Sequence, residues 1–254
     1  MPYSSNLYYQ AYQAGDPSRR ALALIHGAGG HRLSWPSGLR RLSGWRVYAP
    51  DLPGHGKSGG PGLQRIADYG ETLAGWIHSL DLPKVFLVGH SMGGAIALWL
   101  AVQHPELVRG LVLISTGARL PVNLALIEEL STPQGALAAV DRILGWSFNP
   151  GTPKPLIEGV RKAMLETRPS VLAGDFLACD AVDLRSELAG ISLPTLVLVG
   201  ENDKMTPLKY SEELAVEISG AELQVIRGAG HMLPLEAPER VEEALRMFLE
   251  SCGE

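Results

Sequence analysis

The segment that most constrains this chain is Gly89-His90-Ser91-Met92-Gly93-Gly94. The apolar run 85–88 precedes the segment, and residues 95–101 after it favour a helix. A serine at the tip of a sharp strand-to-helix turn, with a glycine two residues away on each side, is typical of a nucleophile elbow. The glycines are needed because a Cβ at either flank would collide where the strand and the helix close up.

The turn has a chemical consequence for Ser91 and Met92. It lifts the Ser91 hydroxyl clear of the sheet, and it aims the Met92 N–H and the positive end of the following helix at the same point in space. The alternative interpretation is a serine N-cap between two small residues that pack closely. The strand before the serine and the helix after it favour the elbow.

Short apolar runs alternate with helical patterns along most of the chain. Buried strands are predicted at residues 21–25, 45–49, 85–88, 111–114, 195–199 and 223–226, after a first strand within 7–13. Helices are predicted at 63–80, 95–101, 208–218 and 239–249, with a short one within 33–42. This alternation predicts an α/β fold, in which a mostly parallel sheet has helices on both faces.

Residues 117–190 interrupt this alternation because they contain no convincing buried strand. Interrupted helical patterns punctuated by prolines predict a helical lid, inserted into a core domain of residues 1–116 and 191–254. A lid must present one face to the site below it, so Leu120, Trp146 and Phe148 are candidate substrate-binding residues. Simple packing onto the core is the alternative for most apolar lid residues.

The lid also carries carboxylates, and these are interpreted as solvated charges on helix surfaces. They are Glu128, Glu129, Glu158, Glu166 and Asp175. The predicted inner face of the lid is therefore apolar, which favours a substrate with an uncharged, moderately hydrophobic acyl or alcohol group.

A serine hydroxyl is a poor nucleophile and needs a base that an acid holds in one tautomer. In an elbow fold these groups follow the serine in the order acid, then histidine. His231 lies in a glycine-containing loop after a predicted strand and is the candidate base, whereas His104 stands at a helix end and is interpreted as structural. Asp203, in a loop at the carboxyl end of the strand 195–199, is the candidate acid, with Glu201 as its competitor.

Acyl transfer also needs two donors for the developing oxyanion. The Met92 N–H is one candidate, and the Ala28 N–H, in the loop after residues 21–25, is the second. A phosphate-binding interpretation of the glycines around Ala28 fails because neither a Gly-Lys-Ser/Thr sequence nor GxGxxG spacing is present.

Composition excludes several classes of function. A net charge of −5 gives no electrostatic case for a nucleic-acid partner or an anionic membrane. No apolar stretch approaches the roughly 18 residues of a membrane span, and residues 1–6 do not resemble a signal peptide. Cys179 and Cys252 are far apart, so a disulfide framework or a zinc site is not expected, and Cys179 lacks a motif for a nucleophile. We expect a cytoplasmic protein, either a monomer or a homodimer.

Five segments in this order resemble the α/β-hydrolase superfamily over nearly the whole chain. They are His26-Gly27-Ala28-Gly29-Gly30, residues 51–58, residues 89–94, Gly200-Glu201-Asn202-Asp203 with Pro207, and Gly230-His231-Met232 with residues 236–239. The resemblance implies an eight-stranded sheet with a helical lid after the sixth strand. It also implies Ser91 as nucleophile, His231 as base, Asp203 as acid, and Met92 and Ala28 as oxyanion amides. It implies no cofactor and no metal.

The superfamily leaves the reaction open. A serine at position 91, where relatives that open epoxides or remove halides carry aspartate, argues against those two activities. The leading hypothesis is a carboxylesterase-like serine hydrolase that acts on a small-molecule ester of small to medium size. The first alternative is a carbon–carbon bond hydrolase of aromatic ring-cleavage products, and the second is a ligand-binding relative with vestigial turnover.

Overall fold

The computed structural model describes residues 3–16 and 18–253; residues 1 and 2 of the N-terminal segment considered above lie outside this range, as do Pro17 and Glu254. Eight strands form one sheet in the order β1-β2-β4-β3-β5-β6-β7-β8. They are β1 (Tyr3–Ser4), β2 (Leu7–Tyr12), β3 (Ala21–Ile25), β4 (Arg46–Pro50), β5 (Val85–His90), β6 (Val108–Ile114), β7 (Thr195–Gly200) and β8 (Glu222–Ile226).

The sheet is parallel except at the edge formed by β1 and β2. β1 pairs antiparallel with β2, and β2 pairs antiparallel with β4, whereas every pairing from β4 to β8 is parallel. All residues of β3, β4, β5 and β7 are buried, as continuous apolar runs require when helices cover both faces. The predicted α/β fold is confirmed.

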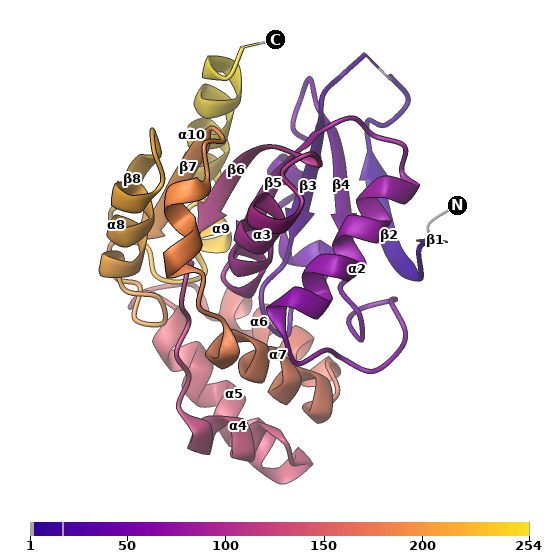
Figure 1. Ribbon diagram of the computed structural model, residues 1–254. Helices are drawn as coiled ribbons and strands as arrows, with labels where there is room; N and C mark the ends of the chain where they lie inside the picture. The colour runs from indigo at the N-terminus through magenta and orange to yellow at the C-terminus, as the bar shows by residue number, and fades with distance from the viewer. Residues whose placement is uncertain (1–2, 17, 254) are drawn as a thin grey trace.

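Helices cover the sheet on both sides (Figure 1). α2 (Ile66–Ser79), α3 (Met92–Gln103) and α8 (Leu208–Glu217) pack on one face, where Tyr69, Trp76 and Leu98 belong to a large buried cluster. On the other face a second cluster joins α1 (Ser37–Arg40) and α10 (Pro238–Ser251) to the sheet. Two short helices, η1 (Arg32–Ser34) and α9 (Leu233–Glu236), lie in the loops after β3 and β8.

The predicted lid region is helical and lies at the end of the sheet where the parallel strands terminate (Figure 1). It leaves the core after β6 and returns at β7. Its helices are α4 (Leu124–Leu130), α5 (Pro133–Ser147), α6 (Lys154–Glu166), α7 (Pro169–Ala181) and η2 (Arg185–Gly190). Helices α4 to α7 bury an apolar cluster of their own, which includes Leu130, Val140 and Phe176, whereas Leu188 of η2 belongs to the core cluster. This helical region (residues 117–190), for which we keep the name lid, therefore combines internal packing with a surface that faces the strand ends; its role as a lid stays a prediction.

None of the helices in the described part of the chain has the length and apolar character needed to cross a membrane.

Candidate active site

Ser91 occupies a strained turn between β5 and α3. Its backbone has φ 53° and ψ −121°, a conformation that residues with a side chain rarely adopt. A Cβ on Gly89 would lie 2.3 Å from the Gly93 oxygen, and a Cβ on Gly93 would lie 2.2 Å from the Ile25 oxygen. The glycines on both sides of Ser91 are therefore required for this close approach, as the sequence predicts.

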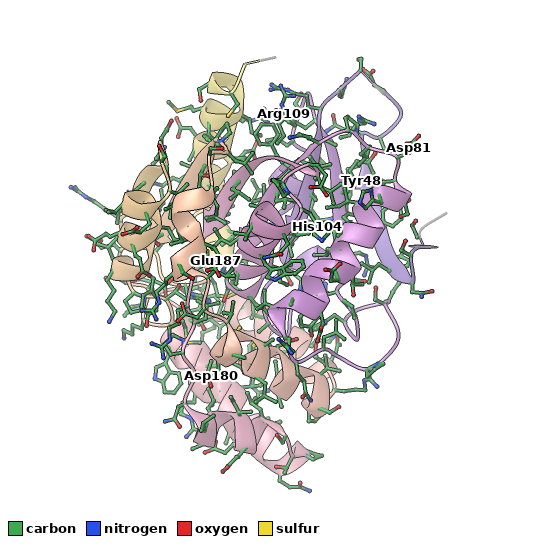
Figure 2. The ribbon with its side chains drawn as sticks, viewed as in Figure 1. Tyr48, Asp81, His104, Arg109, Asp180 and Glu187 are labelled. Carbon is green, nitrogen blue, oxygen red and sulfur yellow. The ribbon has the colours of Figure 1, made fainter. Side chains whose placement is uncertain are left out.

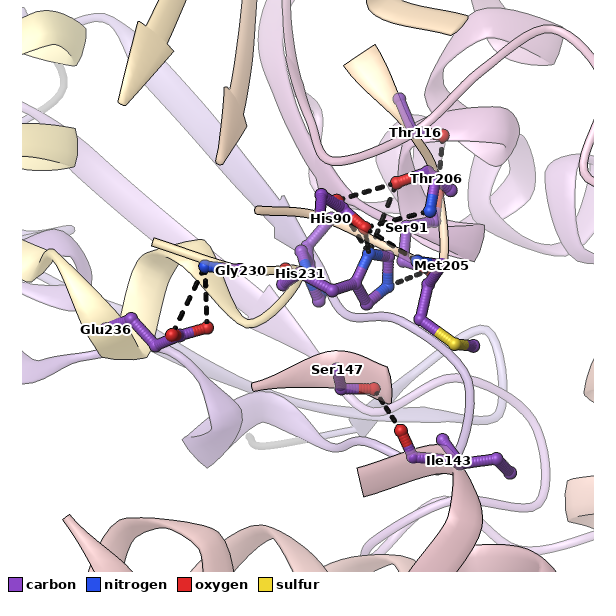
Figure 3. A network of polar contacts seen from close by, with 11 residues as sticks. His90, Ser91, Thr116, Ile143, Ser147, Met205, Thr206, Gly230, His231 and Glu236 are labelled. Atoms are coloured by element: carbon purple, nitrogen blue, oxygen red, sulfur yellow. Dashed lines mark hydrogen bonds and ion pairs between the residues drawn. The ribbon is translucent and has the colours of Figure 1, made fainter. Parts of the chain in front are cut away.

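The structure brings Ser91, His231 and Asp203 together from three separate loops. Figure 3 shows Ser91 and His231 side by side. His231 Nε2 lies 3.0 Å from Ser91 Oγ, and His231 Nδ1 lies 3.0 Å and 3.1 Å from the two carboxylate oxygens of Asp203. The carboxylate can only accept, so Nδ1 carries the proton and Nε2 is free to accept the serine proton. The chain thus holds a serine, a base and an acid in one hydrogen-bonded line.

Asp203 is held in place by the loop that carries it. Its carboxylate accepts hydrogen bonds from the backbone N–H groups of Met205 and Thr206, each 2.9 Å long, and from the Thr206 hydroxyl at 2.9 Å. Burial alone would raise the pKa of Asp203, but the neighbouring His231 ring and the hydrogen bonds to the carboxylate outweigh it, so the pKa lies below its ordinary value. Asp203 therefore stays ionised beside His231.

The two competitors named from the sequence lie elsewhere. Glu201 is exposed and accepts a hydrogen bond from the Gly228 N–H at 3.1 Å. His104 stands at the end of α3, with its Nε2 3.5 Å from the Glu71 carboxylate on α2 (Figure 2). Neither side chain is part of the hydrogen-bonded line at Ser91.

The loop that carries His231 is fastened by residues to which the sequence analysis assigned no individual role. His90 Nε2 donates to the His231 carbonyl at 2.8 Å, and burial lowers the pKa of His90 to about 4, which keeps that ring neutral. The Ser147 carbonyl at the end of lid helix α5 accepts from the His231 N–H at 2.8 Å. The Glu236 carboxylate accepts from Gly230 at 3.2 Å and from Asn149 at 2.9 Å, which joins this loop to the lid.

The second candidate oxyanion donor lies in the loop after β3, which we call the oxyanion loop (residues 26–30). The Gly27 carbonyl accepts from the Gly30 N–H at 3.1 Å and from His26 Nδ1 at 2.9 Å. His26 Nε2 accepts from the Leu52 N–H at 3.0 Å, and burial lowers the pKa of His26 to about 3, so Nδ1 carries the ring's one proton. A peptide bond is planar and trans, so the hydrogen bonds to the Gly27 carbonyl also restrain the direction of the Ala28 N–H.

A cavity of about 360 Å³ opens between Ser91 and the lid. Ala28 and His231 line it together with mainly apolar lid side chains. Those apolar residues are Leu120, Val122, Ile143, Leu144, Leu156, Val160, Met164 and Phe176. Cys179 also lines the cavity, and burial raises the pKa of its thiol, so it stays protonated. The space beside Ser91 therefore favours an uncharged, hydrophobic group.

The three predicted substrate-binding residues differ in whether they line the cavity. Leu120 lines the cavity, whereas Trp146 and Phe148 are not among the described residues that line it. Trp146 is 40% exposed, and Phe148 is buried in the apolar cluster of the lid.

The prediction that Asp175 is a solvated surface charge is wrong, because its exposed fraction is 0%. It lies on α7 and accepts hydrogen bonds from the core, including one from the Gly29 N–H at 2.9 Å. Helical periodicity did not reveal this, because the partners of Asp175 are more than 100 residues away in sequence.

Within residues 3–16 and 18–253, no three His, Cys, Asp or Glu side chains gather in a way that could hold a metal ion.

Comparison with known proteins agrees with the fold. Residues 22–244 match a family described as "Alpha/beta hydrolase family". A hydrolase from Pseudomonas aeruginosa PA01 has 30% sequence identity and a TM-score of 0.85, over 96% of this chain and 94% of that one.

Two further solved structures cover almost the full length of both chains. An enol-lactonase from Burkholderia xenovorans LB400 is 26% identical with a TM-score of 0.90, over 96% of each chain. A thermophilic esterase from Thermogutta terrifontis is 29% identical with a TM-score of 0.87, over 98% of this chain and 94% of the other.

Proposed function

The chain belongs to the alpha/beta hydrolase family, and from this premise we propose that it is a serine hydrolase that cleaves carboxylic esters through an acyl-enzyme. The observation that carries the proposal is the hydrogen-bonded line of Ser91, His231 and Asp203, with 3.0 Å between His231 Nε2 and Ser91 Oγ. A general base at this distance can remove the serine proton as the hydroxyl attacks a carbonyl carbon.

In the proposed first half-reaction, Ser91 Oγ bonds to the ester carbonyl carbon while its proton passes to His231 Nε2. The carbonyl oxygen becomes an oxyanion, which the N–H groups of Met92 and Ala28 stabilise. Asp203 holds the ring orientation and stabilises the imidazolium. The tetrahedral species then collapses, the bond to the alcohol oxygen breaks, and His231 gives its proton to the departing alcohol.

In the second half-reaction, water attacks the acyl group on Ser91, and His231 takes a proton from that water. Collapse releases the carboxylic acid, and the proton returns to Ser91 Oγ. Two easier steps through one covalent intermediate thus replace one difficult step.

The proposed substrates are uncharged esters of small to medium hydrophobic acids or alcohols. The apolar lining of the cavity supports this, and so does its volume of about 360 Å³. A lactone is a cyclic ester and undergoes the same attack, and the similarity to an enol-lactonase gives a reason to include lactones among the substrates tested.

The proposal is tested by hydrolysis of p-nitrophenyl esters from acetate to decanoate and of simple lactones, with Ser91→Ala assayed in parallel. We expect turnover by the parent, a maximum at an intermediate chain length, and a loss of nearly all turnover in Ser91→Ala. Equal rates for the parent and Ser91→Ala, or a folded parent that hydrolyses none of these compounds, would contradict the proposal.

A further inference from the structure

A buried carboxylate of the lid reaches three separate segments of the core. Asp175 Oδ1 accepts from the Tyr69 hydroxyl on α2 at 2.6 Å. Asp175 Oδ2 accepts from His55 Nε2 at 2.8 Å and from the Gly29 N–H at 2.9 Å. A carboxylate taken fully out of water is costly unless its oxygens are paired, and here both oxygens are.

The partners of His55 favour a positive charge on its ring when the Asp175 carboxylate is ionised. Its Nδ1 lies 3.0 Å from the Pro53 carbonyl, and its Nε2 lies 2.8 Å from the Asp175 carboxylate. Both ring nitrogens thus face oxygens that only accept, so both carry a proton. A buried ion pair therefore joins the lid and the core here. Removal of either partner would leave the other as an unpaired buried charge.

The third partner of Asp175 belongs to the oxyanion loop. Gly29 has a left-handed backbone, with φ 63°, and a Cβ there would lie 2.8 Å from Leu172 Cδ1 on α7. The Thr167 hydroxyl, also in the lid, donates to the Gly29 carbonyl at 3.4 Å. The lid thus contacts Gly29 at its N–H, at its carbonyl and across its Cα.

Ala28 lies between two fixed points. On its N-terminal side the core holds the Gly27 carbonyl through His26 and Gly30. On its C-terminal side the lid holds the Gly29 N–H through Asp175. Freeing the second point would loosen Gly29 and the adjoining Gly30 N–H, which holds the Gly27 carbonyl, so the Ala28 N–H would lose part of its restraint even though Asp175 does not line the cavity within the described residues.

We propose that Asp175 is a positioning residue, through which the lid fixes the direction of the Ala28 N–H in the oxyanion loop. This inference rests on the proposed function, since it assigns that N–H to the oxyanion. A donor that is aimed correctly matters more in the transition state than in the ground state, so its loss lowers kcat more than it raises KM.

The test compares Asp175→Ala and Asp175→Asn with Tyr69→Phe. Tyr69→Phe removes a hydrogen bond to the same carboxylate but leaves the bond between Asp175 Oδ2 and Gly29. Each variant is measured for kcat and KM on one p-nitrophenyl ester, for Tm, and for the rate at which a fluorophosphonate labels Ser91. Labelling also passes through an oxyanion, and it does not depend on the identity of the natural substrate.

We expect Asp175→Ala to lower kcat and the labelling rate by roughly tenfold to a hundredfold, with KM changed less than about threefold. Asp175→Asn keeps one acceptor oxygen, so its loss of kcat is expected to be smaller. Tyr69→Phe should lower Tm while kcat stays within about threefold of the parent. A kcat and a labelling rate equal to the parent in Asp175→Asn and Asp175→Ala would overturn the inference, and Asp175→Asn decides if Asp175→Ala does not fold.

The outcomes also separate this inference from the proposed function. A parent that hydrolyses no ester but is labelled at Ser91 would contradict the esterase proposal, and slower labelling of the Asp175 variants would still support the positioning role. If kcat falls in the Asp175 variants only as far as Tm falls, and Tyr69→Phe shows the same relation between kcat and Tm, Asp175 has a purely structural role. A parent that is neither active nor labelled would overturn both.

Discussion

The core loops and the lid contribute to the site by different physical means. Ser91, His231 and Asp203 all come from loops of the core, and charge-assisted hydrogen bonds and backbone geometry hold them. The lid contributes mainly apolar side chains to the cavity, such as Val160 and Phe176. Core contacts depend on angles and charges, whereas lid contacts depend on shape and volume.

The comparison leads to different expectations for substitutions in the two regions. A change in the core loops should lower kcat for every ester alike, because the same atoms react in each case. A change in the lid lining should redistribute kcat/KM among chain lengths, because apolar contacts discriminate by fit. Asp175 is the exception on the lid side, since its carboxylate bonds to the oxyanion loop.

After Ser91→Ala, which removes the nucleophile, the largest effect on kcat is expected for Asp203→Asn. An amide NH₂ facing His231 Nδ1 favours the tautomer with its proton on Nε2, which cannot accept the serine proton. We expect kcat to fall by about 10³- to 10⁴-fold for every ester. Glu201→Gln is the matched control, because Glu201 is a neighbouring but exposed acid, and its kcat should equal that of the parent. A larger loss of kcat in Glu201→Gln than in Asp203→Asn would show that Glu201, and not Asp203, is the acid that holds His231.

A smaller, selective effect is expected for Val160→Phe on lid helix α6. The added ring fills part of the cavity, so kcat/KM for the decanoate ester should fall by about tenfold while acetate changes little. Leu165→Ala is the control on the same helix, since Leu165 is 37% exposed and does not line the cavity within the described residues. Equal losses of kcat/KM for acetate and decanoate in Val160→Phe would show that this residue does not determine the preference for chain length.

The junction between lid and core is expected to weaken at alkaline pH. Burial alone lowers the pKa of His55, but the charge and hydrogen bond of Asp175 outweigh this, so the pKa lies above its ordinary value of 6.5. The Pro53 carbonyl and Asp51 add to the rise, and the His26 ring packs against His55 at 5.0 Å.

Because the pKa of His55 is raised in the folded protein, its protonated form stabilises the fold. A group whose folded pKa is raised contributes stability that is fully present below pH 6.5 and is lost as the pH rises through the folded pKa. Tm of the parent should therefore fall as the pH rises through the folded pKa of His55, and the fall should be shallower in His55→Gln. Parallel Tm profiles for the two proteins would contradict a charged His55.

The smallest effect is expected for Arg185→Ala. The Asp183–Arg185 pair is 2.6 Å long and lowers the pKa of Asp183 to about 2, but both side chains are about half exposed. An exposed pair within one loop contributes little to stability, so the urea midpoint should shift only marginally. A shift as large as that of Asp175→Asn would show that this surface pair fastens the lid.

Much of the core could be predicted from sequence because its signals are local. The glycines around Ser91 predicted the elbow, and their missing side chains are what permits the contact between Gly93 and Ile25. The apolar runs predicted β3 and β7 to within one residue at their ends. The loop glycines and the chain order of serine, acid and histidine predicted catalytic roles for Asp203 and His231; in the structure both lie in one hydrogen-bonded line with Ser91, and their roles stay predictions.

The lid was less predictable because its contacts are long-range. Helical periodicity identified the region as helical, but not which side of α5 faces the cavity, so Trp146 was selected although it is 40% exposed. Asp175 has its partners 106, 120 and 146 residues away in sequence. Nothing local in α7 marks it as buried, and only the folded arrangement provides its three donors.

The most direct test of the central claim is detection of the acyl group on Ser91 itself. The parent and Ser91→Ala are mixed with p-nitrophenyl butyrate, quenched in acid within the first turnover and examined by peptide mass spectrometry, while released p-nitrophenolate is measured. The account predicts a butyryl group on the peptide that contains Ser91, formed together with nitrophenolate, and none in Ser91→Ala. Turnover by the parent with an unmodified Ser91 peptide, or the same turnover in Ser91→Ala, would contradict it.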